Sequence, residues 1–187
     1  MVARRKVGGM PPILTGPSRE GERHMADRDS PEPTPPFAVE SVPWTEWSHG
    51  PRFGSRYRAL TDLGGGSRVG VAIEELPPGK QSCPFHYHLL EEEHLLVLEG
   101  RAKLRLGERT YDIAAGDYVC FPAGQKAGHC LINDGDTPCR FLIIGERNPN
   151  DVVVYPDSGK VKVRPTGESY RLDATVEYWE GEADAAG

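Results

Sequence analysis

Apolar and polar side chains alternate in short runs along the middle of the chain. Within residues 68–76, Val69, Val71 and Ile73 are separated by small or polar neighbours. Residues 101–106 place aliphatic side chains on one face and basic side chains on the other. Alternation with a period of two is typical of a β-strand with one buried face. We therefore expect a strand in each segment.

Similar runs, each bounded by turn-forming residues, indicate more strands. Pro77, Pro78 and Gly79 end the first run, and Gly107 with Glu108 is typical of a hairpin turn. No glycine-rich nucleotide-binding motif and no strand–helix alternation occurs in the sequence. Many short strands at such intervals favour an all-β barrel or a double-sheet jelly roll. Further strands are expected at residues 85–88, 93–98, 110–113, 118–121, 128–133 and 140–145, with edge strands at 152–154 and 161–163.

The distribution of apolar residues divides the chain into three parts. The N-terminal part is charged, rich in proline and nearly free of large apolar side chains, so burial cannot offset its ordering entropy. Met25 lies inside this part and is an alternative start of the protein, and Trp44 and Trp47 restore apolar mass. Near the other end, we expect Tyr178 and Trp179 to pack back on the barrel. The expected parts are a disordered tail at residues 1–41, one β-barrel domain at 42–165, and a C-terminal extension with an acidic end at 166–187.

Composition and charge narrow the class of partner. The formal net charge is -6, and no basic stripe occurs in the part expected to fold. Phosphate backbones require clustered Lys and Arg, so nucleic acid is not an expected partner. No apolar run approaches the roughly 20 residues of a membrane span, and the N-terminus lacks the continuous apolar stretch of a secretory signal. We expect a cytoplasmic protein that does not enter a membrane.

The four cysteines, Cys83, Cys120, Cys130 and Cys139, form no C-x-x-C pair. Nothing in the sequence indicates an oxidising compartment, so we interpret them as reduced thiols. Packing as small apolar side chains is favoured over a role as metal ligand or redox sensor.

Three histidines and a glutamate stand within the expected strands. His86 and His88 are two residues apart, and side chains so spaced on a strand point to the same face. Glu93 follows after a tight bend, and His129 follows a Pro-x-Gly turn. Three imidazoles and one carboxylate suit a borderline divalent transition metal. Burial without a cation would leave polar groups unpaired at a cost of roughly 1–3 kcal/mol each, which favours a metal site over ordinary core or surface histidines.

The spacing of these residues resembles the two sequence motifs of the cupin superfamily, over roughly residues 68–146. The first motif comprises Gly79, six residues, His86-Tyr87-His88, four residues, Glu93, six residues and Gly100. The second comprises Gly116, five residues, Pro122-Ala123-Gly124, four residues, His129, three residues and Asn133. The gap before the first histidine is one residue longer than in the family, and the gap before the last histidine is two residues longer.

The resemblance implies an all-β, cupin-type double-stranded β-helix, that is, a jelly-roll barrel. Carried over by position, it implies His86, His88, Glu93 and His129 as the ligands of one divalent transition metal. Iron, manganese or zinc is favoured, and nickel or cobalt would also suit these ligands.

The run of three glutamates leaves a choice of carboxylate ligand. The six-residue step to the following glycine selects Glu93, while Glu92 fits a looser spacing from His88 and is the alternative. Glu91 is expected to be a solvated charge in a hairpin. His94 should point to the face opposite the site, because neighbouring side chains on a strand alternate.

Several activities are open to such a site. A four-ligand metal keeps coordination positions for a substrate oxygen, water or dioxygen and can polarise a carbonyl. We expect a small-molecule site inside the barrel, and a metalloenzyme of the oxygenase type or an isomerase acting on sugar or carbonyl substrates. The alternative is a non-catalytic, metal-dependent module that binds or senses a small ligand.

The residues that would catalyse the reaction are unknown from sequence. Isomerisation would require a base distinct from the ligands, for which Tyr87, Tyr118 and Lys126 are only loose candidates. The family commonly forms dimers, so we expect a homodimer. Residues 152–154 and the segment with the two tryptophans, Trp44 and Trp47, are the expected contact surfaces.

Overall fold

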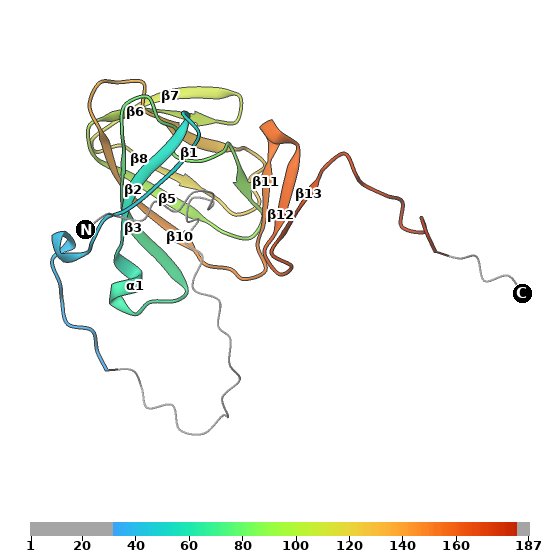
Figure 1. Cartoon of the computed structure of the whole chain (residues 1–187), viewed down its shortest axis with the longest axis horizontal. Coiled ribbons are helices and arrows are strands. Elements are labelled where there is room, and N and C mark those ends of the chain that lie inside the picture. Colours follow the sequence, from blue (N-terminus) through green and yellow to red (C-terminus); the bar gives the residue numbers. More distant parts are fainter. Residues whose placement is uncertain (1–31, 183–187) are drawn as a thin grey trace, which may run out of the picture.

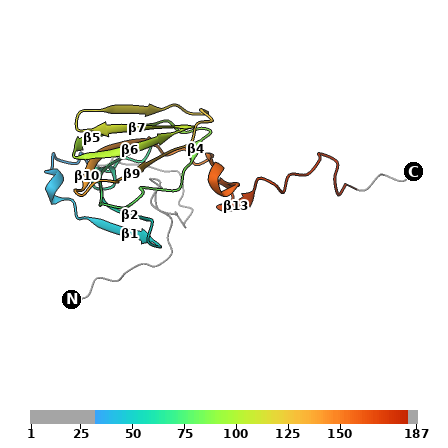
Figure 2. The same cartoon turned by 90° about the horizontal axis from the view of Figure 1, so that it is seen from above.

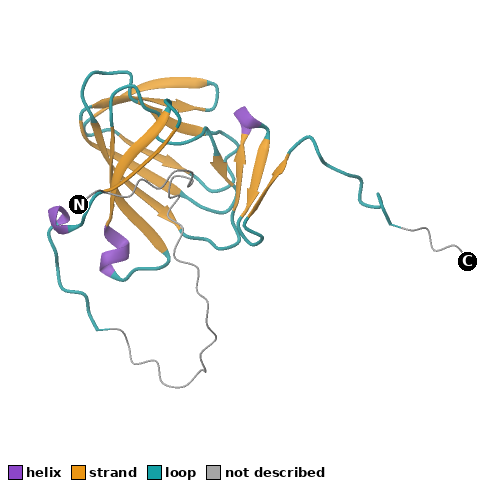
Figure 3. Cartoon of the chain, in the orientation of Figure 1, coloured by secondary structure: helices purple, strands orange, loops and turns teal. Residues whose placement is uncertain are grey.

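The computed structural model describes residues 32–182, and nearly all of its regular structure is β (Figures 1 and 3). The strands are β1 (Thr45–His49), β2 (Phe53–Ala59), β3 (Val69–Leu76), β4 (Tyr87–His88), β5 (Glu93–Glu99), β6 (Arg101–Leu106), β7 (Arg109–Ala114), β8 (Tyr118–Phe121), β9 (His129–Ile132), β10 (Cys139–Glu146), β11 (Val152–Tyr155), β12 (Lys160–Val163) and β13 (Glu168–Arg171). The helical elements are short: α1 (Leu60–Gly64) and the 3-10 turns η1 (Val39–Ser41) and η2 (Pro156–Ser158).

The strands form three antiparallel sheets. The largest has the order β1-β2-β3-β10-β5-β8, the second β7-β6-β9, and the third β13-β12-β11-β4. The first two enclose the main core. Because side chains alternate along each strand, every core strand contributes one apolar face. The buried core residues are Leu76, Leu95, Val97, Ala102, Leu104, Phe121, Leu131, Cys139 and Phe141. The predicted all-β jelly-roll class is confirmed.

The turn between β5 and β6 shows why glycine stands there. Gly100 has a φ of 78°, in the left-handed region that favours glycine. A Cβ at this position would also lie 2.5 Å from the carbonyl oxygen of Pro138. The turn thus fixes the connection that brings β5 and β6 onto opposite sides of the core.

The strands predicted in the middle of the chain are present with small shifts of their ends. The alternation did not reveal β1, β2 or β13, and α1 was not expected. Residues 152–154 were predicted as an edge strand and a dimer surface, and both predictions are wrong. Strand β11 lies between β4 and β12, and Val153 and Tyr155 are buried within the chain. Its pairing with β4 is short, since it consists only of Val153 opposite His88 and Val154 opposite Tyr87.

The two tryptophans of the expected dimer surface are half-buried in this chain. Trp44 packs beneath the guanidinium groups of Arg56 and Arg58, and Trp47 donates its indole N–H to Ser55. The homodimer therefore stays a prediction.

The C-terminal end of the described chain does not pack on the barrel as expected. The expected disordered tail, residues 1–41, lies mostly outside the described residues. At the other end β13 pairs with β12, but Tyr178 and Trp179 are 83% and 74% exposed. The expectation that they pack on the barrel is wrong. Both views show this segment running away from the sheets, and beyond β13 its backbone hydrogen bonds are mainly local turns, so nothing returns the rings to the core (Figures 1 and 2).

The cysteines form no disulfide, as predicted for reduced thiols. Within residues 32–182, no helix has the length and apolarity that crossing a membrane requires.

Candidate metal centre

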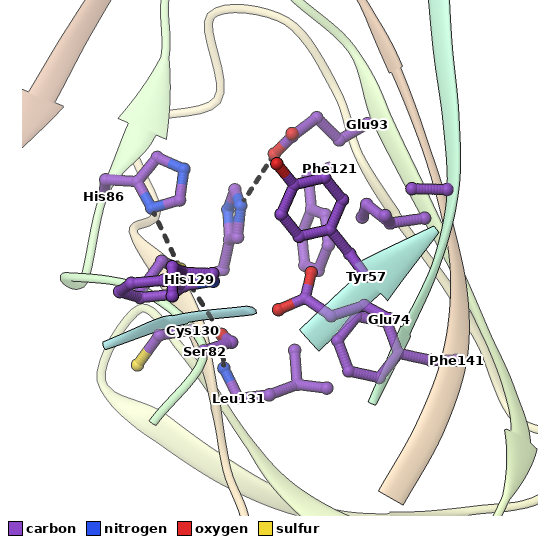
Figure 4. A pocket seen from close by; sticks show the side chains of 14 residues that line it. Tyr57, Glu74, Ser82, His86, Glu93, Phe121, His129, Cys130, Leu131 and Phe141 are labelled. Atoms are coloured by element: carbon purple, nitrogen blue, oxygen red, sulfur yellow. Dashed lines mark hydrogen bonds and ion pairs between the residues drawn. The ribbon is translucent and has the colours of Figure 1, made fainter. Parts of the chain in front are cut away.

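Three short segments bring the predicted ligands together. His86 lies just before β4 and forms an antiparallel bridge with His129, the first residue of β9. His88 ends β4, and Glu93 begins β5 after the intervening bend. The longer loop before His129 does not displace it from the cluster. Figure 4 shows His86, His129 and Glu93 pointing into one cavity.

The four side chains are buried and in close contact. The Oε2 atom of Glu93 lies 3.0 Å from Nε2 of His129 and 3.6 Å from Nε2 of His88. The ring centroid of His86 lies 5.0 Å from that of His88 and 4.6 Å from that of His129. Ligand atoms of His86, His88 and Glu93 all lie within 4.8 Å of one another. This is a spacing that one cation could span.

Burial and the neighbouring charges hold two members of the cluster in the protonation state that binds a cation. Burial, together with the charge of His129, lowers the pKa of His86 to about 3, so its imidazole is neutral at neutral pH. Burial alone would raise the pKa of Glu93. The hydrogen bond from His129 and the charges of His88 and His129 outweigh that effect and lower the pKa to about 2. Neutral imidazole and ionised carboxylate are the forms that bind metals.

The hydrogen bonds around the rings test whether a metal would fit. Nδ1 of His86 lies 2.9 Å from the carbonyl oxygen of Pro84, and Nδ1 of His88 lies 2.7 Å from Oδ2 of Asp151. Both acceptors take the Nδ1 proton, so Nε2 has its lone pair whenever the ring is neutral. Burial opposes a charge on His88, but the hydrogen bond to Asp151 and the nearby carboxylates outweigh it and raise the pKa of His88, so a bound cation would displace a proton from its Nε2. Nε2 of His88 is buried and has no hydrogen-bond partner. A cation would supply that partner, and between His129 and Glu93 it would replace the shared proton. The donor set fits a divalent transition metal.

Glu91 departs most from its predicted environment. It was expected to be a solvated hairpin charge, but it is only 1% exposed. Its carboxylate accepts hydrogen bonds of 2.5 Å from Nη2 of Arg164 and from the backbone N–H of Asn148. Burial raises the pKa of Glu91 to about 7 despite the opposing charge of Arg164. The prediction is wrong because Arg164 is distant in sequence and becomes a neighbour only through the fold.

The residues on either side of Glu93, Glu92 before the strand and His94 within it, lie on the outer face. Nε2 of His94 is 3.0 Å from Glu92, its Nδ1 is 2.6 Å from the hydroxyl of Tyr118, and Cys120 lies opposite on β8. The prediction that His94 points away from the site is confirmed. Glu92, the alternative ligand, shares this outer face and does not reach His86 or His88.

A cavity of about 80 Å³ adjoins the cluster, large enough for several water molecules or part of a small ligand (Figure 4). Its walls come from both faces of the barrel interior and are mainly apolar. The lining residues are Trp47, Tyr57, Ala72, Glu74, Ser82, Cys83, His86, Glu93, Phe121, His129, Cys130, Leu131, Phe141 and Ile143. The predicted base candidates Tyr87, Tyr118 and Lys126 are not among them.

Glu74 is the functional candidate that the sequence did not reveal. It lies on β3 opposite Tyr57 of β2 and Phe141 of β10, and its carboxylate faces the cavity (Figure 4). Burial raises its pKa to about 7; a hydrogen bond with Ser55 opposes the rise, and the charge of Glu93 adds to it. The strongest apolar alternation in this segment belongs to the opposite face of the strand, so the inward face was overlooked.

Comparison with known proteins gives relatives that are close in fold. The sequence profile of the cupin domain matches residues 72–145. Among solved structures, a candidate sugar phosphate isomerase from Acidithiobacillus ferrooxidans is 31% identical with a TM-score of 0.70, and the match covers 74% of this chain and 91% of that one. No curated protein matches the chain in sequence.

Two further structures extend the comparison. A sugar phosphate isomerase from a cupin superfamily, from Silicibacter pomeroyi, is 29% identical with a TM-score of 0.66, and the match covers 75% of this chain and 95% of that one. The polyketide cyclase RemF from Streptomyces resistomycificus is 23% identical over 61% of this chain and 80% of its own, with a TM-score of 0.50. The last likeness is one of fold alone.

Proposed function

Because this chain belongs to the cupin superfamily, we propose that it is a metal-dependent isomerase acting on a small sugar or sugar phosphate. The reaction would move a proton between neighbouring carbons next to a carbonyl group. One observation carries the proposal: a carboxylate that belongs to no ligand set, Glu74, faces the same cavity as the His/Glu cluster. The two sugar phosphate isomerase structures support the same class of reaction.

The metal site would consist of His86, His88, Glu93 and His129. Iron, manganese or zinc is preferred, with nickel and cobalt also compatible. When bound, such a metal polarises a substrate carbonyl and so makes the neighbouring C–H bond more acidic.

Glu74 would act as the base and then as the acid. Its carboxylate would take the proton from the carbon next to the carbonyl, which leaves an enediolate, and the hydroxyl proton on that carbon's oxygen would pass to the former carbonyl oxygen. The same carboxyl then returns the proton to the adjacent carbon. A pKa of about 7 suits both halves of this exchange at neutral pH. Burial raises the pKa of Tyr57 on the same wall, so its hydroxyl stays protonated and can donate a hydrogen bond to a substrate oxygen.

Glu74 also favours isomerisation over the oxygenase chemistry that the sequence allowed. An oxygenase would use open metal positions for dioxygen and has no need of a second carboxylate in the cavity. Proton transfer between carbons needs such a group within reach of the substrate. Glu74 supplies it without leaving the metal short of a ligand.

Solvent deuterium exchange tests the proposal directly. The protein, reconstituted in turn with Mn²⁺, Zn²⁺, Fe²⁺, Co²⁺ and Ni²⁺, is incubated in D₂O with aldoses, ketoses and their phosphates. Mass spectrometry should detect one deuteron next to the carbonyl and formation of the isomer. Glu74→Gln should lower this rate about 100-fold or more while the metal content stays unchanged. Glu92→Gln, which removes a carboxylate from the outer face, is the matched control.

Two results would contradict the proposal. Equal exchange by wild type and Glu74→Gln would exclude the residue as the base. Saturable sugar binding without any exchange would instead support the non-catalytic, ligand-binding alternative.

We also propose that the protein acts in the cytoplasm as a homodimer. The free thiols support a reducing compartment, and the net charge of -6 argues against nucleic acid as a partner. Strand β1 ends the largest sheet, so its outer edge is available to a second copy in the described part of the chain. The molar mass in solution would test this.

A further inference from the structure

We propose that Asp151 and Arg164 are positioning residues through which the C-terminal hairpin, β11–β12, sets the orientation of His88 and thereby the metal affinity of the site. The inference rests on the proposed metal site, but it does not depend on the isomerase reaction. Neither residue belongs to the cluster of His86, His88, Glu93 and His129.

Asp151 is held from several directions. It lies immediately before β11, and its side chain is fully buried. Oδ2 accepts a hydrogen bond of 2.7 Å from Nδ1 of His88, and Oδ1 accepts one of 2.9 Å from the backbone N–H of Leu90. Its own backbone N–H donates to Asn148, and its carbonyl accepts from the N–H of Arg164. The carboxylate therefore has little freedom to leave His88.

Arg164 completes the arrangement from the end of β12. Its Nη2 donates to Oε2 of Glu91 at 2.5 Å, and its Nε lies 3.8 Å from Oδ2 of Asp151. The same Oε2 of Glu91 is 3.3 Å from Nδ1 of His88. One guanidinium thus lies beside two buried carboxylates that converge on one ring nitrogen. Glu91, Asp151 and His88 have a spacing that could hold a cation, but Arg164 already supplies the positive charge there.

The hydrogen bond to Asp151 determines which nitrogen of His88 faces the cluster. A carboxylate accepts but cannot donate, so Nδ1 must carry a proton, and in the neutral ring Nε2 keeps its lone pair. Nε2 is buried, has no hydrogen-bond partner and lies 3.6 Å from Glu93. Such outer carboxylates fix the tautomer and orientation of a ligand imidazole, and their loss typically costs 10–100-fold in metal affinity.

The sheet itself gives His88 little support. Strand β4 has two residues and pairs with β11 through two residue pairs. The side-chain contacts made by Asp151 and Arg164 therefore carry much of the connection between β4 and the hairpin. By thermodynamic reciprocity, metal bound at His88 would also stabilise the docked hairpin.

Metal affinity in the absence of substrate is the test. Co²⁺ and Zn²⁺ dissociation constants are measured on the full chain by competition with a chromophoric chelator. In Asp151→Asn, an NH2 group replaces one of the two oxygens that accept from His88 and from Leu90, so one of these donors meets another donor and the ring loses its fixed tautomer. We expect affinity 10–100-fold weaker than wild type at unchanged stoichiometry, and a smaller loss, about 3–10-fold, for Arg164→Gln.

Matched controls come from the same part of the chain. Asp157→Asn removes a carboxylate that pairs with Arg105, and Arg171→Gln removes an exposed ion pair with Asp173. Both should stay within about twofold of wild type. Imidazole ¹⁵N shifts of the metal-free proteins provide a readout that a general loss of stability would not move. Recorded at a pH where the imidazole is neutral, they should show Nδ1-protonated His88 in wild type and mixed tautomers in Asp151→Asn.

The outcomes separate the inference from the proposed function. Affinities of both variants within twofold of wild type would overturn it, and an effect of Asp151→Asn alone would remove Arg164 from it. Should Asp151→Asn fail to fold, Arg164→Gln alone decides. No metal binding by the wild type would overturn both the metal site and this inference. Weakened binding in a protein without isomerase activity would support the inference and refute only the proposed reaction.

Discussion

Two histidine–carboxylate pairs, one on each face of β5, have the same contact distance and different surroundings. On the inner face of β5, Glu93 lies 3.0 Å from His129; on the outer face, Glu92 lies 3.0 Å from His94. The inner pair is buried, whereas the outer side chains keep a third or more of their surface exposed. One step along a strand reverses the face. Distance alone therefore does not make a site. Glu92, His94 and Cys120 also place three ligand atoms within 4.8 Å of one another, and burial is what distinguishes the inner group from the outer one.

The largest expected effect is on metal content, when one histidine is removed on each side of β5. His88→Ala should abolish stoichiometric metal, because the remaining side chains lose the donor next to Glu93. His94→Ala should retain one equivalent. Elemental analysis of both proteins after dialysis against trace metal measures the difference. Equal metal content would remove the inner cluster from consideration as the site.

The next largest expected effect is the loss of unfolding free energy when each of two neighbouring glutamates is removed. Glu91→Ala leaves Arg164 buried without its carboxylate, and breaking a buried pair in this way costs about 3–5 kcal/mol of unfolding free energy. Glu92→Ala breaks a solvated pair and should cost about 1 kcal/mol or less. Urea denaturation of the metal-free proteins gives both values. A cost for Glu91→Ala as small as that of Glu92→Ala would show that the buried ion pair contributes little.

The smallest effect concerns the cavity carboxyl. Folding raises the pKa of Glu74 from 4.5 to about 7, so the folded state prefers its protonated form. The stabilising contribution of protonation is complete below pH 4.5 and is lost as the pH rises to about 7. In metal-free protein, wild type should lose about 1–3 kcal/mol relative to Glu74→Gln across that interval. A pH-independent difference between the two proteins would contradict the buried position of this carboxyl.

The contrast also shows what the sequence could predict. The strands and the four clustered residues follow local rules, because alternation and short spacings survive folding unchanged. Val153 was misjudged because a run of three valines fits an edge and an interior strand equally well. The partnership of Glu91 with Arg164 depends on how the β11–β12 hairpin packs against the segment that follows β4, which no spacing encodes. Glu74 was missed for a different reason: on the inward face of β3 only Leu76 is a large apolar residue, so apolar alternation does not mark that face.

The shortness of β4 bears on how an ion would enter and leave. The proposed donors are closed off from solvent, and the strand that carries one of them is attached to its neighbour by only two residue pairs. Local separation of β4 from the hairpin, which would also break the hydrogen bond between Asp151 and His88, would be one way to open the cluster. The rate of metal exchange would then be limited by the rate of this local opening. If opening is slow, the metal in a purified sample would be the one that bound first rather than the one with the highest affinity.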